Sequence, residues 1–94
     1  MYYLYILFSE KLNRFYVGQT NDLLSRLKRH NSGQENYTSK GVPWEIVYFV
    51  QLESRGKAMR MEKKLKNLKS QSRLKDFIDR EISAGRGCRG IENL

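Results

Sequence analysis

The fold is decided by residues 2–9, YYLYILFS, and by residues 14–18, RFYVG, which follow a short polar turn. The first segment is continuously apolar and aromatic, a pattern typical of a strand that is covered on both faces. Glu10, Lys11 and Asn13 supply the turn, and the second segment is again rich in aromatic residues. The two segments therefore predict a β-hairpin.

After the hairpin, the apolar residues change to helical spacing and predict a first helix. Its possible capping residues are Thr20, Asn21 and Asp22, and its apolar residues are Leu23, Leu24 and Leu27. Gly33 can close this helix. Residues 33–43 contain the only proline of the chain and are typical of a loop. Residues 44–52 are rich in β-branched and aromatic side chains, which predicts a third strand.

Two more helices complete the pattern. Ser54 can cap a long helix, and Ser70 or Ser72 can begin a last helix that ends near Gly85. Their apolar stripes are formed by Ala58, Met61, Leu65 and Leu68 in the first and by Leu74, Phe77, Ile78 and Ile82 in the second. The order ββαβαα predicts an α+β fold in which a three-stranded antiparallel sheet is flanked by helices. We expect one domain over residues 1–84 and a flexible tail over residues 85–94.

Composition narrows the class of function. A chain of 94 residues forms a domain too small for a large internal cavity, so we expect an open groove. The net charge of +8 attracts polyanions such as nucleic acid or an anionic membrane surface. Cys88 is the only cysteine, which excludes an internal disulfide framework and fits a reducing, cytoplasmic setting. The apolar N-terminus is too short for a membrane span or a signal peptide, so we expect no membrane association.

Arg26 and His30 lie close together on one edge of the first helix's apolar stripe. A guanidinium can hold a phosphate with two hydrogen bonds, and a neighbouring imidazole can donate a hydrogen bond or move a proton. The alternative is that Arg26 only solubilises the helix and that His30 is an ordinary boundary residue.

Glu62 is the only acid in the basic stretch from Arg55 to Lys75. On a helical wheel it lies on the shoulder of the apolar stripe, where its carboxylate can face the sheet and bind a hard cation such as Mg²⁺. The alternative is an ordinary helix pair with Lys66, worth about 0.2 to 0.5 kcal/mol. The surrounding lysines can contact a phosphate backbone or form a solvated outer face; the candidates are Lys57, Lys63, Lys66 and Lys69.

Tyr5 and Tyr16 can be ordinary strand residues or active phenols. A phenol with a pKa of about 10 is a poor base at neutral pH unless a nearby cation lowers its pKa. Gly18 either marks a turn or lets the backbone or a substrate come close. Tyr37 and Trp44 can stack on bases, although a tryptophan at the start of a strand is usually part of the core.

Together these residues resemble the GIY-YIG nuclease superfamily, and more closely its short members related to the UvrC repair nuclease. The resemblance covers roughly residues 1–80. It is carried by Tyr3-Leu4-Tyr5, Tyr16-Val17-Gly18, Arg26, His30-Asn31-Ser32-Gly33, Tyr37-Thr38, Pro43-Trp44 and the helix with Ala58, Glu62 and Lys66.

The resemblance implies a metal-dependent DNA endonuclease. Tyr16 would be the base that activates water, and Tyr5 would be the second tyrosine of the site. Arg26 would neutralise the scissile phosphate and His30 would assist proton transfer. Glu62 would bind one divalent cation, Mg²⁺ or Mn²⁺. We expect weak or structure-directed specificity for DNA that is branched or single-stranded, a role in DNA repair, and a partner protein that supplies targeting.

The sequence departs from the family pattern at several positions. Tyr3, Leu4 and Val17 are conservative replacements within the strands. Gln19 stands where the repair nuclease has a lysine, and Leu74 stands where an asparagine is expected. These two departures leave open a second hypothesis, a catalytically weak module that binds nucleic acid in the same groove, and a third, an adaptor for other proteins.

Overall fold

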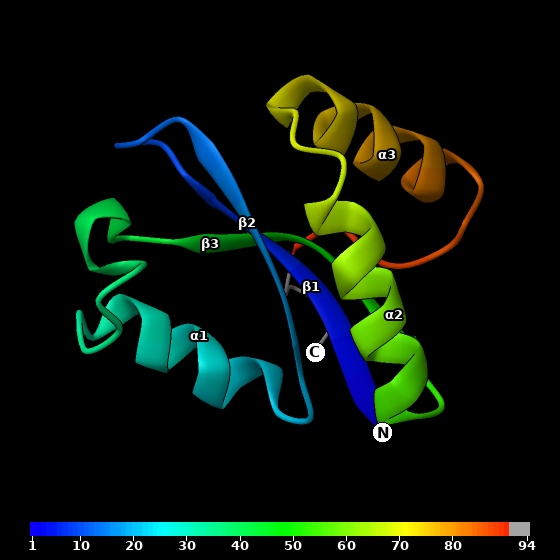
Figure 1. The fold of residues 1–94 in the computed structure, drawn as a ribbon, viewed down its shortest axis with the longest axis horizontal. Helices are drawn as coiled ribbons and strands as arrows, with labels where there is room; N and C mark the ends of the chain where they lie inside the picture. The colour runs from blue at the N-terminus through cyan, green and yellow to red at the C-terminus, as the bar shows by residue number, and fades with distance from the viewer. Residues whose placement is uncertain (91–94) are drawn as a thin grey trace.

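Within residues 1–90, the part of the chain that the computed structural model describes, three strands and three α-helices follow one another as ββαβαα (Figure 1). This order confirms the α+β fold predicted from the sequence. The strands are β1 (Tyr2–Ser9), β2 (Arg14–Thr20) and β3 (Glu45–Leu52), and the helices are α1 (Leu23–Asn31), α2 (Arg55–Lys66) and α3 (Gln71–Ser83). A short 3-10 helix (Ser39–Gly41) lies in the segment predicted as a loop.

The sheet is antiparallel throughout, with the strand order β2-β1-β3. β1 is central and is covered on both faces, as its continuous apolar sequence predicted. Leu4 and Ile6 face one side, and Tyr5 and Leu7 face the other. All four side chains are buried. β2 is an edge strand, which leaves one row of its backbone groups without a strand partner.

The helices divide between the two faces of the sheet. α1 packs on one face through Leu23 and Leu27, and α2 and α3 pack on the other through Leu65, Leu74 and Ile78. Figure 1 shows α1 on one side of the strands and α2 and α3 on the other. The domain therefore has two apolar cores separated by one sheet.

Local capping explains where the helices begin. The side chains of Asp22, Ser54 and Ser70 each accept a hydrogen bond from the backbone N–H three residues later. These bonds satisfy N–H groups that the first turn of a helix leaves without a partner. Each of these residues was among the capping candidates in the sequence.

The segment after α3 lies against β3. Phe49 and Cys88 exchange two backbone hydrogen bonds, at 2.9 and 2.8 Å, and the Tyr48 hydroxyl donates to the Arg86 carbonyl at 3.0 Å. The sequence predicted a flexible tail from residue 85 to residue 94; within it, Arg86 and Cys88 make these contacts with β3. Residues 91–94 of that predicted tail lie outside the described residues.

None of the helices described over residues 1–90 is long and apolar enough to cross a lipid bilayer.

Candidate active site

Tyr5 and His30 are joined by a buried hydrogen bond. Tyr5 points from the central strand toward α1, and its hydroxyl lies 3.0 Å from His30 Nε2 in the last turn of that helix. Tyr5 pairs with Gly18 across the hairpin, and a Cβ atom at Gly18 would overlap the Tyr5 hydroxyl and ring. Gly18 is therefore a strand glycine that makes room for the phenol, and the turn alternative is excluded.

His30 is held on both ring nitrogens. Its Nδ1 lies 3.0 Å from Thr38 Oγ1, and the Thr38 carbonyl accepts a hydrogen bond from Trp44 Nε1 at 2.7 Å. His30 and Thr38 are only 2% and 1% exposed. Burial is the main cause that lowers the His30 pKa; Arg26 and Arg29 lower it further, and Glu35 opposes them. A neutral imidazole has one donor and one acceptor, which suits two hydroxyl partners.

Sequence reasoning missed the contributions of Thr38 and Glu35. Thr38 was quoted only as part of the resemblance, next to Tyr37, although a small hydroxyl residue in a loop was the available signal. Glu35 pairs with Arg29 at 2.8 Å, and its negative charge raises the pKa of both Tyr5 and Tyr16. The loop before β3 thus closes the site from the side of α1.

Tyr16 lies in a cluster of rings at the wall of a groove. Its ring centroid is 5.1 Å from that of His30, 5.6 Å from that of Tyr37 and 6.2 Å from that of Trp44. Trp44 is buried, as expected for a core residue, whereas Tyr37 is 81% exposed and offers a free aromatic face. The Lys66 ammonium lies 5.5 Å from the centre of the Tyr16 ring. Tyr16 is half-buried and open to the groove.

The two phenols differ in environment. Burial strongly raises the pKa of Tyr5, and the charge of Tyr16 raises it further. Burial also raises the pKa of Tyr16, but Lys66 is the next cause and lowers it. Tyr5 is therefore kept protonated more firmly than Tyr16.

Glu62 lies on α2, one turn before Lys66. Burial is the main cause that raises the pKa of Tyr5 and of Tyr16, and the negative charge of Glu62 adds to both shifts. The side chain is 24% exposed and pairs with Lys66 at 3.2 Å. The helix pair considered from the sequence is thus present, and it lies beside Tyr16.

Arg26 lies on the same side of the domain, half-buried on α1. With Thr20, Asn21 and Arg55 it lines a hollow of about 200 Å³ that also includes Gln19. Burial raises the pKa of both Tyr5 and Tyr16, and the positive charge of Arg26 opposes this rise at each phenol. This hollow shares no lining residue with the groove beside Tyr16, and Tyr5, His30 and Glu62 line neither of the two.

The predicted lysines divide into two groups. Lys66 and Lys69 line the groove beside Tyr16, a hollow of about 440 Å³. Lys57 and Lys63 are exposed elsewhere on α2, and Lys57 pairs with Glu53 at 3.1 Å. The groove therefore receives its positive charge from the C-terminal end of α2 and the turn that follows.

The donor set around Glu62 fits a partly hydrated metal ion. Among residues 1–90, no group of three or more His, Cys, Asp or Glu side chains comes together as a metal site made by protein alone would need. Mg²⁺ is commonly held by one or two carboxylates, water and substrate oxygens. One carboxylate beside an open groove meets that requirement, provided that Lys66 releases it.

A three-stranded antiparallel sheet in the order β2-β1-β3 with helices on both faces is consistent with the fold of the nucleases named after the motifs GIY and YIG. The family model described as the GIY-YIG catalytic domain matches residues 1–75. The chain belongs to the GIY-YIG family, whose members are nucleases that generally use divalent metal ions, so its substrate is nucleic acid.

Several similar bacterial proteins are named UPF0213 proteins. The one of Staphylococcus haemolyticus is 34% identical over 80 residues, which cover 84% of this chain and 96% of that protein. The one of Clostridium perfringens is 37% identical over 83 residues, or 87% and 88% of the two chains. The one of Pediococcus pentosaceus is 33% identical over 72 residues, or 76% of each chain. No solved structure matches this chain.

Proposed function

We propose that the protein is a metal-dependent endonuclease that hydrolyses phosphodiester bonds in DNA with weak or structure-directed specificity. The observation that carries the proposal is the cluster at Tyr16. Its ring lies 5.1 Å from that of His30, which is hydrogen-bonded to Tyr5, and 5.5 Å from the Lys66 ammonium, which pairs with Glu62.

Tyr16 is the residue that accepts a proton from the attacking water. Tyr16 is the more accessible of the two tyrosines. Burial raises the pKa of Tyr16 and the nearby Lys66 ammonium opposes this rise, so Tyr16 can act as a base only once its hydroxyl is ionised. Tyr5 is buried and its hydroxyl is already engaged with His30, so it serves as the second tyrosine of the site. His30 assists proton movement only through Tyr5 Oη, because Thr38 occupies its other nitrogen.

Arg26 holds and neutralises the scissile phosphate, since a guanidinium matches two phosphate oxygens. Glu62 would hold one divalent cation, Mg²⁺ or Mn²⁺. That cation would stabilise the charge that develops on the phosphate and cancel the negative charge of Glu62 that raises the pKa of Tyr16. Lys66, released from Glu62, would remain over the Tyr16 ring and favour the ionised phenol.

We propose branched or single-stranded DNA as its substrates, as in repair. A partner protein would supply targeting, and the setting is cytoplasmic.

A second function is favoured by one specific observation. Leu74, which stands where the resemblance expects an asparagine, is 5% exposed and belongs to the core under α2 and α3. It adds no polar group to the groove. A domain with an incomplete groove could bind nucleic acid and cut it poorly.

A cleavage panel separates these functions. Purified protein is incubated with supercoiled plasmid and with flapped, branched and single-stranded DNA, with Mg²⁺, with Mn²⁺ or with EDTA. We expect metal-dependent cuts, and Glu62→Gln, which keeps the shape of the side chain, should abolish them. Equal activity of Glu62→Gln and the wild type would show that the activity is a contaminant. Binding in EDTA without cleavage in either metal would establish the binding module.

A further inference from the structure

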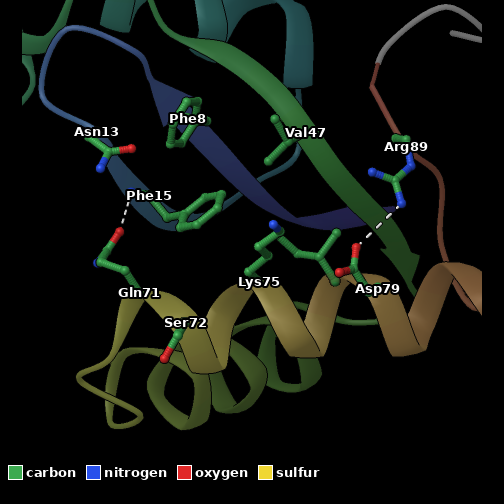
Figure 2. Close-up of a pocket in the computed structure, with 10 residues that line it drawn as sticks. Phe8, Asn13, Phe15, Val47, Gln71, Ser72, Lys75, Asp79 and Arg89 are labelled. Carbon is green, nitrogen blue, oxygen red and sulfur yellow. Dashed lines mark hydrogen bonds and ion pairs between the residues drawn. The ribbon is translucent and has the colours of Figure 1, made fainter.

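A further hollow lies between the sheet and α3, on the face of the hairpin that carries Phe8 and Phe15 (Figure 2). Its volume is about 420 Å³, within the usual range for a small-molecule site. Phe8 and Phe15 form one wall; they pair across the hairpin, with ring centroids 5.0 Å apart. Val47 and Ile78 complete the apolar part. Both phenylalanines are only half-buried, so their rings can be reached from solvent.

The edge of this pocket is polar and carries two cations. Lys75 is exposed on α3, and Arg89 reaches in from the segment after it (Figure 2). Arg89 pairs with Asp79 at 3.6 Å, and the two side chains are 62% and 54% exposed. A pair as open as this contributes little to stability, so the guanidinium can turn to another anion. An aromatic wall beside cations suits a base with its phosphate.

The pocket adjoins the groove of the candidate active site. Both hollows are lined by Phe15 and Gln71, and the Phe15 backbone N–H donates to Gln71 Oε1 at 2.6 Å. Phe15 and Tyr16 are neighbours on edge strand β2, and their side chains point to opposite faces of the sheet. A flexible chain that passes over this edge would meet Tyr16 on one side and the phenylalanines on the other. The basic side chains along that path are those of Lys66, Lys69 and Lys75.

We propose that this pocket binds an unpaired base of the same nucleic-acid strand whose phosphodiester lies at Tyr16. The assignment rests on the proposed function for the identity of the polymer. A base enclosed between phenylalanine rings and a helix cannot keep its partner in a duplex. The pocket thus acts as a subsite at a fixed distance from the cut, and it selects for unpaired nucleotides on that side.

The test measures binding without cleavage, using the full chain in EDTA and fluorescently labelled oligothymidylates. One set is intact, and a second set has a single abasic position moved along the strand. For the wild type we expect one position where loss of the base weakens binding by about fivefold or more, the lower end of what base stacking contributes. Phe8→Leu should weaken the intact strand by a similar factor and leave the strand that is abasic at that position unaffected.

Two matched controls guard against misfolding and simple loss of charge. Phe77→Leu removes a ring that packs on Tyr48 outside the pocket and should bind as the wild type does. Lys75→Gln should weaken all strands, whereas Lys28→Gln on the exposed face of α1 should not. Circular dichroism melts verify that each variant is folded. The proposal is wrong if Phe8→Leu weakens the binding of intact and abasic strands equally, or if it weakens the binding of neither.

Other outcomes identify other occupants. Should the protein dimerise in light scattering and Phe8→Leu dissolve the dimer, the pocket is an interface between copies and the base assignment fails. The cleavage assay tests the proposed function separately, and cleavage by the wild type but not by Glu62→Gln would support it. A base-dependent pocket without cleavage would overturn only the nuclease, and cleavage that is insensitive to Phe8→Leu and to abasic positions would overturn only the pocket.

Discussion

The protonation of His30 can be measured as the titration of a single residue of the site. It is the only histidine of the chain, and its pKa is lowered chiefly by burial. Its unfolded value is about 6.5, so the unfolded state binds the proton more readily than the native state. Stability from this residue is therefore complete above about pH 6.5 and is lost as the pH falls toward the native pKa.

We expect the free energy of unfolding to fall as the pH is lowered from 7 to 5, and to fall less in His30→Gln than in the wild type. Urea denaturation across that range measures this difference. In NMR spectra the His30 C–H signal of the wild type should titrate below its ordinary range. A histidine that titrates at or above 6.5 would show that the imidazole is not enclosed between Tyr5 and Thr38 as described.

Gly18 affects both the packing of the strands and the position of the Tyr5 hydroxyl. An added Cβ would overlap the Tyr5 hydroxyl and ring, so Gly18→Ala must displace the phenol from His30. Overpacking of this kind costs about 1 to 3 kcal/mol. Gly56→Ala is the matched control, because a Cβ there would meet its neighbours only at 3.6 Å or beyond and alanine favours a helix. Thermal unfolding and cleavage rates of the two variants should diverge; equal effects would contradict the tight fit.

At the scale of one element, α1 positions both Arg26 and His30, and its start depends on one cap. Asp22 Oδ1 accepts a hydrogen bond from the Ser25 N–H at 3.1 Å. Asp22→Ala should lower the free energy of unfolding by about 1 kcal/mol, while Asp22→Ser, which can cap as well, should retain most of it. Urea denaturation provides the measurement. Similar losses in both variants would mean that Asp22 acts through its charge instead of its cap.

The elements were predictable because their signals are local. A capping residue, a turn and an alternating or helical apolar pattern lie within a few residues of one another, and Asp22, Ser54 and Ser70 each gave such a signal. The hydrogen bond of Thr38 to His30 had only a weak signal, a small hydroxyl residue in a loop, and the attachment of Cys88 to β3 had none. Both contacts depend on partners distant in the sequence, and a loop or a glycine-rich segment has no apolar periodicity from which such contacts could be predicted.

At the scale of the whole molecule, the net charge is +8, but only some of the basic side chains are placed to contact a bound strand. Lys66 and Lys69 line the groove, whereas Lys57, in the first turn of α2, does not. Each phosphate contact made with single-stranded nucleic acid releases counterions and contributes about 0.7 to the slope of log affinity against log salt. The lysines that touch the strand can therefore be distinguished by their effect on that slope.

We expect Lys69→Gln and Lys66→Gln each to reduce the slope by about 0.7, and Lys57→Gln to change it little, in anisotropy titrations with single-stranded DNA in EDTA from low to moderate salt. All three substitutions remove one positive charge from the same region, so a general effect of net charge would alter the three slopes equally. Equal slopes for all three variants would contradict a defined groove. A larger effect for Lys57→Gln would place the strand at the N-terminal end of α2, nearer Arg26 than Phe15.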